Sequence, residues 1–273
     1  MSPDVSVVVP VFDEAGAAPV LAREIAAAFA GRVYELIFID DASRDETRAA
    51  LAAMTSEIPA LRLLAHARNA GQSRAIRSGV LAARGAVVVV LDGDGQNDPA
   101  DAPRLVDRLA AGPAALAMVG GVRVKRRDSL AKRWASRFAN GVRQRLLKDG
   151  AADTGCGLKA FRREAFLRLP YFDHMHRFMP ALMLREGYEV AFEPVGHRPR
   201  RSGRSKYTNL GRLRASLSDL FGVAWLATRA RDPGPVTEHR SGERIEHRGH
   251  HDQVDGAEEE GHGSSGGSGL ARR

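Results

Sequence analysis

The first 120 residues alternate short apolar runs with longer stretches in which apolar residues recur every three or four positions. The runs are rich in Val, Ile and Leu and hold few polar residues, which is typical of strands buried on both faces of a parallel sheet. We predict strands over residues 5–9, 36–39, 61–65, 87–91 and 116–119. We predict helices between them, over residues 17–30, 44–56, 72–83 and 101–111. This alternation indicates an α/β fold with a doubly wound, mostly parallel sheet and helices on both faces.

The second half of the chain has a more helical pattern. We predict a basic helix over residues 125–150, a loop entering a short strand over 154–161, and a helix over 176–187. In the first half, a capping box is predicted at the start of the 44–56 helix, with Ser43 as the cap and Glu46 three residues later.

The last predicted helix, residues 208–229, is amphipathic. One apolar face is expected to hold Leu210, Leu213, Leu217, Leu220, Ala224 and Trp225. Its longest apolar run is eight residues, against the roughly 18 needed to cross a bilayer, so the helix is expected to lie in a membrane interface. The chain after it is rich in Gly, Ser, His and charge, which is typical of disorder. We therefore expect an α/β domain over 1–206, an amphipathic interfacial helix over 207–230 and a disordered low-complexity tail over 231–273.

Acidic residues follow three of the predicted strands. Asp13 and Glu14 follow the first strand, Asp40 and Asp41 the second, and Asp92 and Asp94 the fourth. Open sheets of this kind bind ligands beyond the carboxyl ends of their strands. Each acid alone could be an ordinary helix cap, but three acidic clusters at three strand ends favour a binding site. The first strand lacks a G-x-G-x-x-G sequence after it, which disfavours a dinucleotide-dependent dehydrogenase.

Charge is unevenly distributed over the 273 residues. The net charge is +8, yet residues 231–273 carry six Lys/Arg and nine Asp/Glu, so the first 230 residues carry a net +11. Basic blocks lie at 123–148 and 198–214, which suits anionic lipid or a phosphorylated substrate. Nucleic acid is disfavoured because the blocks lack interleaved stacking aromatics. The single cysteine, Cys156, excludes an internal disulfide and fits a reducing compartment, and the N-terminus lacks the features of a signal peptide.

Six segments in order carry a resemblance to a known family. They are VSVVVPVFDE, ELIFIDDASRDET, VLDGDGQNDP, DTGCGLKAFRRE, HRFMPAL and HRPRRSGRSKY. Together they resemble a family 2 glycosyltransferase of the GT-A fold, in particular the dolichol-phosphate mannosyltransferase type, which glycosylates a polyprenyl phosphate. The resemblance covers about residues 4 to 228. It implies a GT-A (nucleotide-diphospho-sugar transferase) catalytic domain.

The resemblance implies a donor site at the strand ends. The residues implied to bind the nucleotide are Pro10, Phe12, Glu14, Ile39, Asp41, Asp92, Gly93 and Asp94. Asp92, Asp94 and Gln96 are implied to hold Mg²⁺ or Mn²⁺. The chemistry agrees, because these cations prefer oxygen ligands and can bridge the phosphates of a sugar nucleotide as charge builds on them. Phe12 stands where Tyr is common in the family. The segment 68–72 matches a family loop, although a simple glycine-containing turn explains it equally well.

The resemblance also implies an acceptor site made of basic residues. Arg123, Lys132, Arg133, Arg200 and Lys206 are implied to neutralise the phosphate of the lipid acceptor. Asp94 is implied to orient the sugar as well. Asp153 is expected to contact the sugar or the acceptor, with a role as a loop cap as the alternative. Cys156 has no basic partner beside it in sequence and is not expected to be a nucleophile.

The implied activity is inverting transfer of a sugar from GDP-mannose or a UDP-sugar to a polyprenyl or dolichyl phosphate. The protein is expected in the cytoplasm, peripheral on the inner face of the cell membrane, with an anionic membrane surface as partner and an integral-membrane protein as a further candidate. Two alternatives stay open. One is a GT-A transferase that acts on a carbohydrate hydroxyl, with Asp153 as its base. The other is a non-catalytic nucleotide-sugar-binding subunit that docks on membrane complexes.

Overall fold

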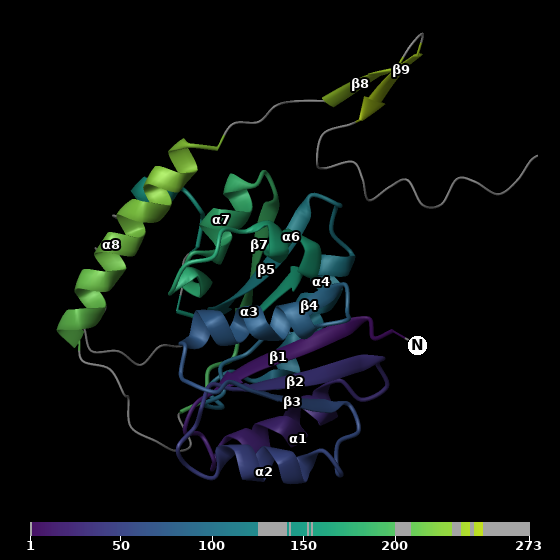
Figure 1. The fold of residues 1–273 in the computed structure, drawn as a ribbon, viewed down its shortest axis with the longest axis vertical. Coiled ribbons are helices and arrows are strands. Elements are labelled where there is room, and N and C mark those ends of the chain that lie inside the picture. Colours follow the sequence, from purple (N-terminus) through teal and green to yellow (C-terminus); the bar gives the residue numbers. More distant parts are fainter. Residues whose placement is uncertain are drawn as a thin grey trace, which may run out of the picture. The chain divides into compact units, whose positions relative to one another are not determined.

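The computed structural model describes residues 2–124, 141, 143–151, 153, 155–199, 209–230, 236–240 and 243–247. The chain divides into two compact units, residues 1–230 and 231–273. The strands of the first unit are β1 (Val5–Val11), β2 (Tyr34–Asp40), β3 (Leu61–Ala65), β4 (Val87–Val90), β5 (Leu116–Arg123), β6 (Lys159–Arg162) and β7 (Glu189–Val195). They form one seven-stranded sheet in the order β3-β2-β1-β4-β6-β5-β7 (Figure 1).

The sheet is mostly parallel, as the sequence predicts. Strand β1 lies parallel between β2 and β4, β3 is parallel to β2, and β7 is parallel to β5. Only β6 runs antiparallel to its neighbours, β4 and β5, in this sheet. The five strands predicted in the first 120 residues all form, with bounds that differ by a few residues at most. Their order brings the carboxyl ends of β1, β2 and β4 to one edge of the sheet.

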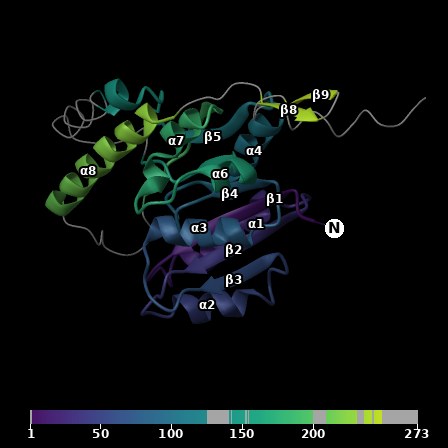
Figure 2. The same ribbon diagram turned by 45° about the horizontal axis from the view of Figure 1, so that its top comes forward.

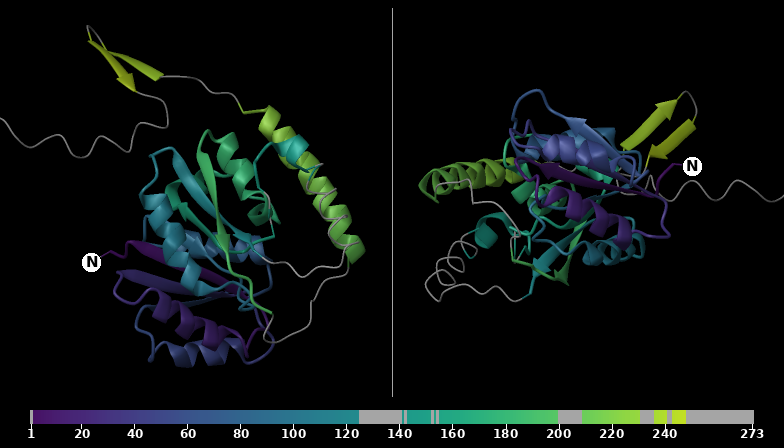
Figure 3. Two further views of the ribbon diagram at one scale, coloured as in Figure 1. Left: turned by 180° about the vertical axis from the view of Figure 1, so that it is seen from behind. Right: turned by 90° about the horizontal axis from the view of Figure 1, so that it is seen from below.

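Helices cover both faces of the sheet (Figure 2). They are α1 (Ala18–Ala28), α2 (Thr47–Met54), α3 (Gln72–Ala82), α4 (Ala102–Ala110), α6 (Arg163–Arg168), α7 (Met179–Arg185) and α8 (Asn209–Thr228). Helices α1, α2 and α4 share one core with one side of the strands, and α3, α6, α7 and α8 share the other. Side chains of β1 alternate between them, because Val7 and Val9 face the first core and Val8 the second. Figure 3 shows the two layers from behind and from below.

Two local predictions are wrong. The capping box at residues 43–46 does not form, because α2 begins after Glu46 and has no side-chain cap. The hydroxyl of Ser43 instead accepts a hydrogen bond from the backbone N–H of Asp13, 2.9 Å away, so a long-range contact replaces the local one. The predicted helix over 176–187 is also divided, into a 3-10 turn η2 (Met175–Arg177) and α7.

Helix α8 packs on the first unit with one side and exposes apolar residues on another. Leu220 and Val223 are buried in the second core. Leu217, Phe221 and Trp225, four residues apart, are 46%, 63% and 58% exposed. The expected single apolar face is therefore wrong for the described side chains, because Leu220 faces the core whereas Leu217 and Trp225 are exposed. The side chains of Leu210 and Leu213 lie outside the described part of the helix. Within the described ranges, no helix combines the length and the apolar character that crossing a bilayer requires.

The second unit contains regular structure where the sequence predicts none. Strands β8 (Val236–Arg240) and β9 (Glu243–His247) pair antiparallel with Val236 opposite His247. Alternating polar and β-branched residues and the Ser-Gly dipeptide between the strands give this segment a hairpin pattern. The remainder of the predicted tail lies outside the described residues. Residues 125–140 of the predicted basic helix also lie outside the described residues. Further along the same predicted helix, residues 143–147 are helical.

A buried carboxylate ties the amino-terminal edge of the sheet together. Glu35 on β2 accepts hydrogen bonds from the Ser6 hydroxyl on β1 and from the backbone N–H of Arg84, each at 2.6 Å, and is paired with Arg62 on β3. Burial by itself would raise the pKa of Glu35, but these hydrogen bonds together hold the pKa below its ordinary value. The charged form of Glu35 is therefore stabilised in the folded state.

We expect Glu35→Gln to lower the free energy of unfolding by about 1–3 kcal/mol at pH 7, because it removes one charged acceptor from a buried network. A group whose pKa is lowered by folding stabilises above its unfolded pKa, about 4.3, and this contribution is lost as pH falls through the folded pKa. The difference between wild type and variant should thus shrink on acidification in urea titrations. Glu57→Gln, in an exposed pair with Arg23, is the control with little effect. A difference that stays constant with pH would contradict this role for Glu35.

Candidate functional site

The ends of β1, β2 and β4 bring the predicted donor residues together. Pro10 of β1 lies opposite Ile39 of β2 in the parallel register. The loop after β4 lies on the end of β1, because a Cβ atom added to Gly93 would be 2.6 Å from the Pro10 carbonyl oxygen and the Val11 side chain. Glycine is therefore required for this close approach. The side chain of Ile39 is fully buried in the core near α3, so this residue offers backbone atoms to the site.

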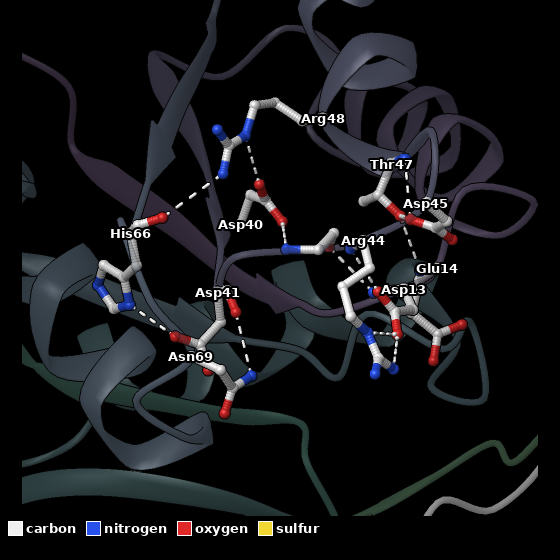
Figure 4. Close-up of polar contacts among 11 residues, drawn as sticks. Asp13, Glu14, Asp40, Asp41, Arg44, Asp45, Thr47, Arg48, His66 and Asn69 are labelled. Atoms are coloured by element: carbon white, nitrogen blue, oxygen red, sulfur yellow. Dashed lines mark hydrogen bonds and ion pairs between the residues drawn. The ribbon is translucent and has the colours of Figure 1, made fainter.

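Asp41, directly after β2, organises the loop that precedes α3 (Figure 4). Its carboxylate accepts hydrogen bonds from the backbone N–H groups of Ala70 and Gly71, at 2.9 and 2.8 Å, and lies 2.7 Å from Nδ1 of His66. Asn69 donates to the Asp41 carbonyl oxygen. Gly71 has a φ of +85°, in the left-handed region that favours glycine. The segment at 68–72 is thus fixed against the end of β2, and His66, which no sequence pattern indicated, belongs to the same hydrogen-bond network.

The loops after β1 and β2 are bound to each other on the opposite side of Asp41 (Figure 4). Asp13 pairs with Arg44 at 2.6 Å and also accepts from the Arg44 backbone N–H. The guanidinium of Arg44 lies over the Phe12 ring, 5.2 Å from its centroid. The backbone N–H of Glu14, a buried residue, donates to the hydroxyl of Thr47. The two loops consequently present Phe12 and Arg44 together at the end of the sheet.

The loop after β4 holds its acids through its own backbone. The N–H of Asp92 donates to the side-chain oxygen of Asn97 at 3.2 Å, and the N–H of Gln96 donates to Asp94 at 3.1 Å. Gln72, the first residue of α3, donates from Nε2 to Oδ1 of Asp92 at 2.8 Å. This last contact joins the acids to the loop that Asp41 organises. Neither Gln72 nor Asn97 was singled out as a site residue from the sequence.

The charges of the acids fit a divalent cation. Burial raises the pKa of Asp92, and the nearby negative charge of Asp94 raises it further. A dication bound beside both half-buried carboxylates would offset this repulsion. No cluster of three or more His, Cys, Asp or Glu side chains suited to a metal occurs among the described residues. The three residues predicted to hold the metal, Asp92, Asp94 and Gln96, all lie in the loop after β4 and carry the oxygen ligands that Mg²⁺ and Mn²⁺ prefer.

The two described residues predicted for the acceptor side form one ion pair. Arg123, the last residue of β5, donates from Nε to Oδ2 of Asp153 at 2.6 Å and from Nη2 to Oδ1 at 2.7 Å. The side chains are only 15% and 8% exposed. The hydrogen bonds to Asp153 raise the pKa of Arg123 above its usual value, so the guanidinium stays charged. The other predicted basic residues, Lys132, Arg133, Arg200 and Lys206, lie outside the described residues.

A buried lysine, Lys159, lies close enough to both Asp92 and Asp153 to feel their charges. Lys159 begins β6, is 7% exposed, and donates from Nζ to the carbonyl oxygen of Cys156. Burial lowers the pKa of Lys159, while the charges of Cys156, Asp92 and Asp153 oppose that shift. No sequence pattern indicates that Lys159 is buried, because a lone lysine in a short strand usually points to solvent. Burial raises the pKa of the Cys156 thiol, which agrees with the expectation that Cys156 is not a nucleophile.

The fold is that of GT-A glycosyltransferases. Residues 6–169 match the model of glycosyl transferase family 2, and the chain belongs to this family. The structure is similar to glucosyl-3-phosphoglycerate synthase from Mycobacterium tuberculosis in complex with Mn²⁺, UDP and glucosyl-3-phosphoglycerate, with a TM-score of 0.64 at 20% identity over 90% of this chain and 87% of that one. The complex of the same enzyme with Mg²⁺ and UDP has a TM-score of 0.63, also at 20% identity, over 90% of this chain and 87% of that one. The GT-A fold implied by the resemblance is thus confirmed.

The similarity to curated relatives covers more of the chain than the family model does. The undecaprenyl-phosphate 4-deoxy-4-formamido-L-arabinose transferase of Pseudomonas aeruginosa is 37% identical over 207 residues, which cover 75% of this chain and 60% of that protein. The protein of the same name from Pectobacterium carotovorum is 36% identical over 211 residues, which cover 76% of this chain and 63% of that protein. The chain therefore matches less than two thirds of the length of these relatives.

Proposed function

We propose that the protein transfers a sugar from a nucleoside-diphosphate sugar to a polyprenyl phosphate, with inversion at the anomeric carbon. One observation carries the proposal: the acid pair Asp92 and Asp94 lies at the carboxyl edge of the sheet with the cation Arg123 on a nearby strand. This pairing suits a reaction between two anionic substrates. The similarity to undecaprenyl-phosphate sugar transferases supports the lipid acceptor.

The donor half is proposed to lie over the ends of β1, β2 and β4. Asp92, Asp94 and Gln96 would hold Mg²⁺ or Mn²⁺, which when bound stabilises the charge that develops on the leaving diphosphate. Phe12 offers an aromatic surface to a base. The segment at 68–72, fixed by Asp41, limits where the nucleotide can lie. UDP is the first nucleotide to test, since structures with the same fold bind UDP with these metals, and GDP is the second.

The acceptor half needs positive charge more than it needs a base. A phosphate monoester has a second pKa of about 6, so its attacking oxygen is largely ionised at neutral pH. Arg123 is proposed to neutralise this phosphate and to hold it in line with the anomeric carbon. Both oxygens of Asp153 accept hydrogen bonds from Arg123, so Asp153 would have to act as a base through an oxygen that is already engaged. This contact favours the phosphate acceptor over the carbohydrate hydroxyl.

A panel assay tests the donor class. The full chain is incubated with Mn²⁺ and a set of UDP- and GDP-sugars, and nucleotide release is measured with and without undecaprenyl phosphate. We expect one donor to release its nucleotide much faster when the lipid is present. Release that ignores the lipid with every donor would contradict the proposed acceptor, and no release from any donor would favour the non-catalytic alternative.

We further propose that the protein acts as a peripheral protein at the cytosolic face of a membrane. Leu217, Phe221 and Trp225 form an exposed apolar stripe on α8, which is itself anchored to the first unit. His174 contacts Asp219 of this helix at 3.1 Å, and Arg185 donates to the Leu226 carbonyl oxygen at 3.2 Å. An anchored helix with an outward apolar stripe suits insertion into the interface of a bilayer, and the net +11 of residues 1–230 suits anionic lipid.

A triple variant tests this membrane contact. We expect the wild type to co-sediment with phosphatidylglycerol vesicles at low salt and to be partly released at high salt, because surface charge is screened. Leu217→Ser, Phe221→Ser and Trp225→Ser together should abolish most binding without lowering Tm. Leu81→Ser, at a 56% exposed apolar residue of α3, is the matched control. Equal binding of the triple variant would contradict the proposal, and carbonate-resistant retention on cell membranes would point to an integral-membrane partner.

A further inference from the structure

The loop that precedes β6 lies directly against Asp92, one of the two acids in the loop after β4. Val90 of β4 pairs antiparallel with Lys159 of β6, so continuing the register brings Asp92 opposite Gly157. A Cβ atom added to Gly157 would lie 2.1 to 2.4 Å from the carboxylate atoms of Asp92. Real Cβ atoms do not approach other heavy atoms this closely. The carboxylate of Asp92 therefore occupies the space that a side chain at position 157 would need.

Two residues earlier, at Gly155, the same loop lies against Arg123, the residue proposed to bind the acceptor phosphate. A Cβ atom added to Gly155 would lie 2.8 Å from Nη2 of Arg123 and 3.6 Å from Oδ1 of Asp153. The guanidinium that pairs with Asp153 thus rests on the backbone of Gly155. One residue, Cys156, separates the two contacts in sequence.

The backbone of this loop is held in place from several directions. The N–H of Gly121 on β5 donates to the Leu158 carbonyl oxygen at 2.9 Å, and the N–H of Cys156 donates to the Asp153 carbonyl oxygen at 3.4 Å. The buried ammonium of Lys159 binds the Cys156 carbonyl oxygen. A loop fixed in this way cannot move aside easily when a methyl group is added at 155 or 157.

We propose that Gly155 and Gly157 are positioning residues that set the locations of Arg123 and Asp92 relative to each other. This proposal rests on the proposed function, in which Asp92 serves the donor metal and Arg123 the acceptor phosphate. Because both side chains rest on one short, fixed stretch of backbone, the loop defines the separation between the leaving-group side and the attacking side. In-line displacement depends on such a separation, and small displacements lower rates strongly.

A thermal double-mutant cycle tests the contact without any assay of activity. Gly157→Ala should lower Tm by at least about 3 °C in the full chain, as expected for a clash near the core. In an Asp92→Ala background, where the carboxylate is gone, the same change should lower Tm by less than half as much. If Gly157→Ala alone does not fold, the double variant should. Gly85→Ala is the control, because its Cβ would meet the Ser6 backbone 2.8 Å away, far from Asp92, and its effect should be the same in both backgrounds.

Direct Mn²⁺ binding gives the second readout. With electron paramagnetic resonance of free Mn²⁺, Gly157→Ala should weaken Mn²⁺ binding at least about tenfold, whereas Gly155→Ala and Gly85→Ala should change it less than about twofold. Equal Tm losses for Gly157→Ala in both backgrounds, or unchanged Mn²⁺ affinity in folded Gly157→Ala, would overturn the positioning role. If positions 92 and 157 are coupled but the protein transfers no sugar to undecaprenyl phosphate, the contact between Gly157 and Asp92 is supported. The proposed function is then overturned instead.

Discussion

Asp92→Asn and Asp94→Asn should each lower the rate of sugar transfer by at least about 10²-fold, which is the loss typical of removing one preorganised electrostatic group from an active site. Asparagine keeps the shape and the acceptor oxygen, so the contacts from Gln72 to Asp92 and from Gln96 to Asp94 can persist. The change therefore removes charge while the loop stays in place. Initial rates at saturating donor and acceptor, with Mn²⁺ varied, measure the effect.

Three comparisons make this result specific. Chelation of divalent cations should reduce the wild type to a similar low rate. Asp107→Asn, in an exposed pair with Arg32, is the matched control and should keep full activity. Both acid variants should melt close to the wild type, because Asp92 and Asp94 repel each other in the folded state. Full turnover in either variant, or in chelator, would show that the acids hold no catalytic metal.

Arg123→Ala should be nearly as damaging, with an expected loss of about 10²-fold in kcat/KM for the lipid acceptor. The change removes the cation proposed to neutralise the attacking phosphate and leaves Asp153, which is 8% exposed, without its partner. Breaking a buried pair from one side costs about 3–5 kcal/mol of stability, so Tm should fall as well. Arg123→Lys, which keeps charge but loses the planar fork, should lie between wild type and Arg123→Ala.

Stability and chemistry can be separated at this pair. The double variant Arg123→Met with Asp153→Leu replaces both charges by apolar groups and should recover much of the lost Tm while remaining inactive. Arg23→Lys, at an exposed bidentate pair with Glu57, controls for loss of an arginine fork and should be neutral. Recovery of activity together with Tm in the double variant would mean that the ion pair only supports the fold.

The sequence was sufficient for the sheet because its strands are buried on both faces, as for β1, where every residue is buried. A strand buried on both faces is a continuous apolar run, which can be recognised in the sequence without knowing its neighbours. The sequence was also sufficient to place the three pairs of acids at one edge, since residues that follow neighbouring parallel strands must meet there. It was insufficient at Ser43, where a long-range contact with Asp13 replaces the local cap that the pattern favours.

Other features depend on contacts that no local pattern encodes. The pairing of Arg123 with Asp153 joins residues 30 positions apart, whereas the sequence suggests a separate role for each of them. Lys159 is buried because charged partners from other segments surround it. The division of the apolar residues of α8 between core and surface follows from where α7 lies, which the helix sequence alone does not contain.

The identity of the glycosylated product shows whether the protein transfers sugar to a polyprenyl phosphate. The full chain with Mn²⁺ and a radiolabelled sugar nucleotide is given undecaprenyl phosphate, undecaprenol or no lipid, and the label is measured after organic extraction. We expect label to enter the organic phase only with the phosphorylated lipid, and we expect Asp94→Asn to abolish this labelling. Equal labelling of undecaprenol, or label that goes to a water-soluble carbohydrate while undecaprenyl phosphate stays unlabelled, would contradict the proposed transfer.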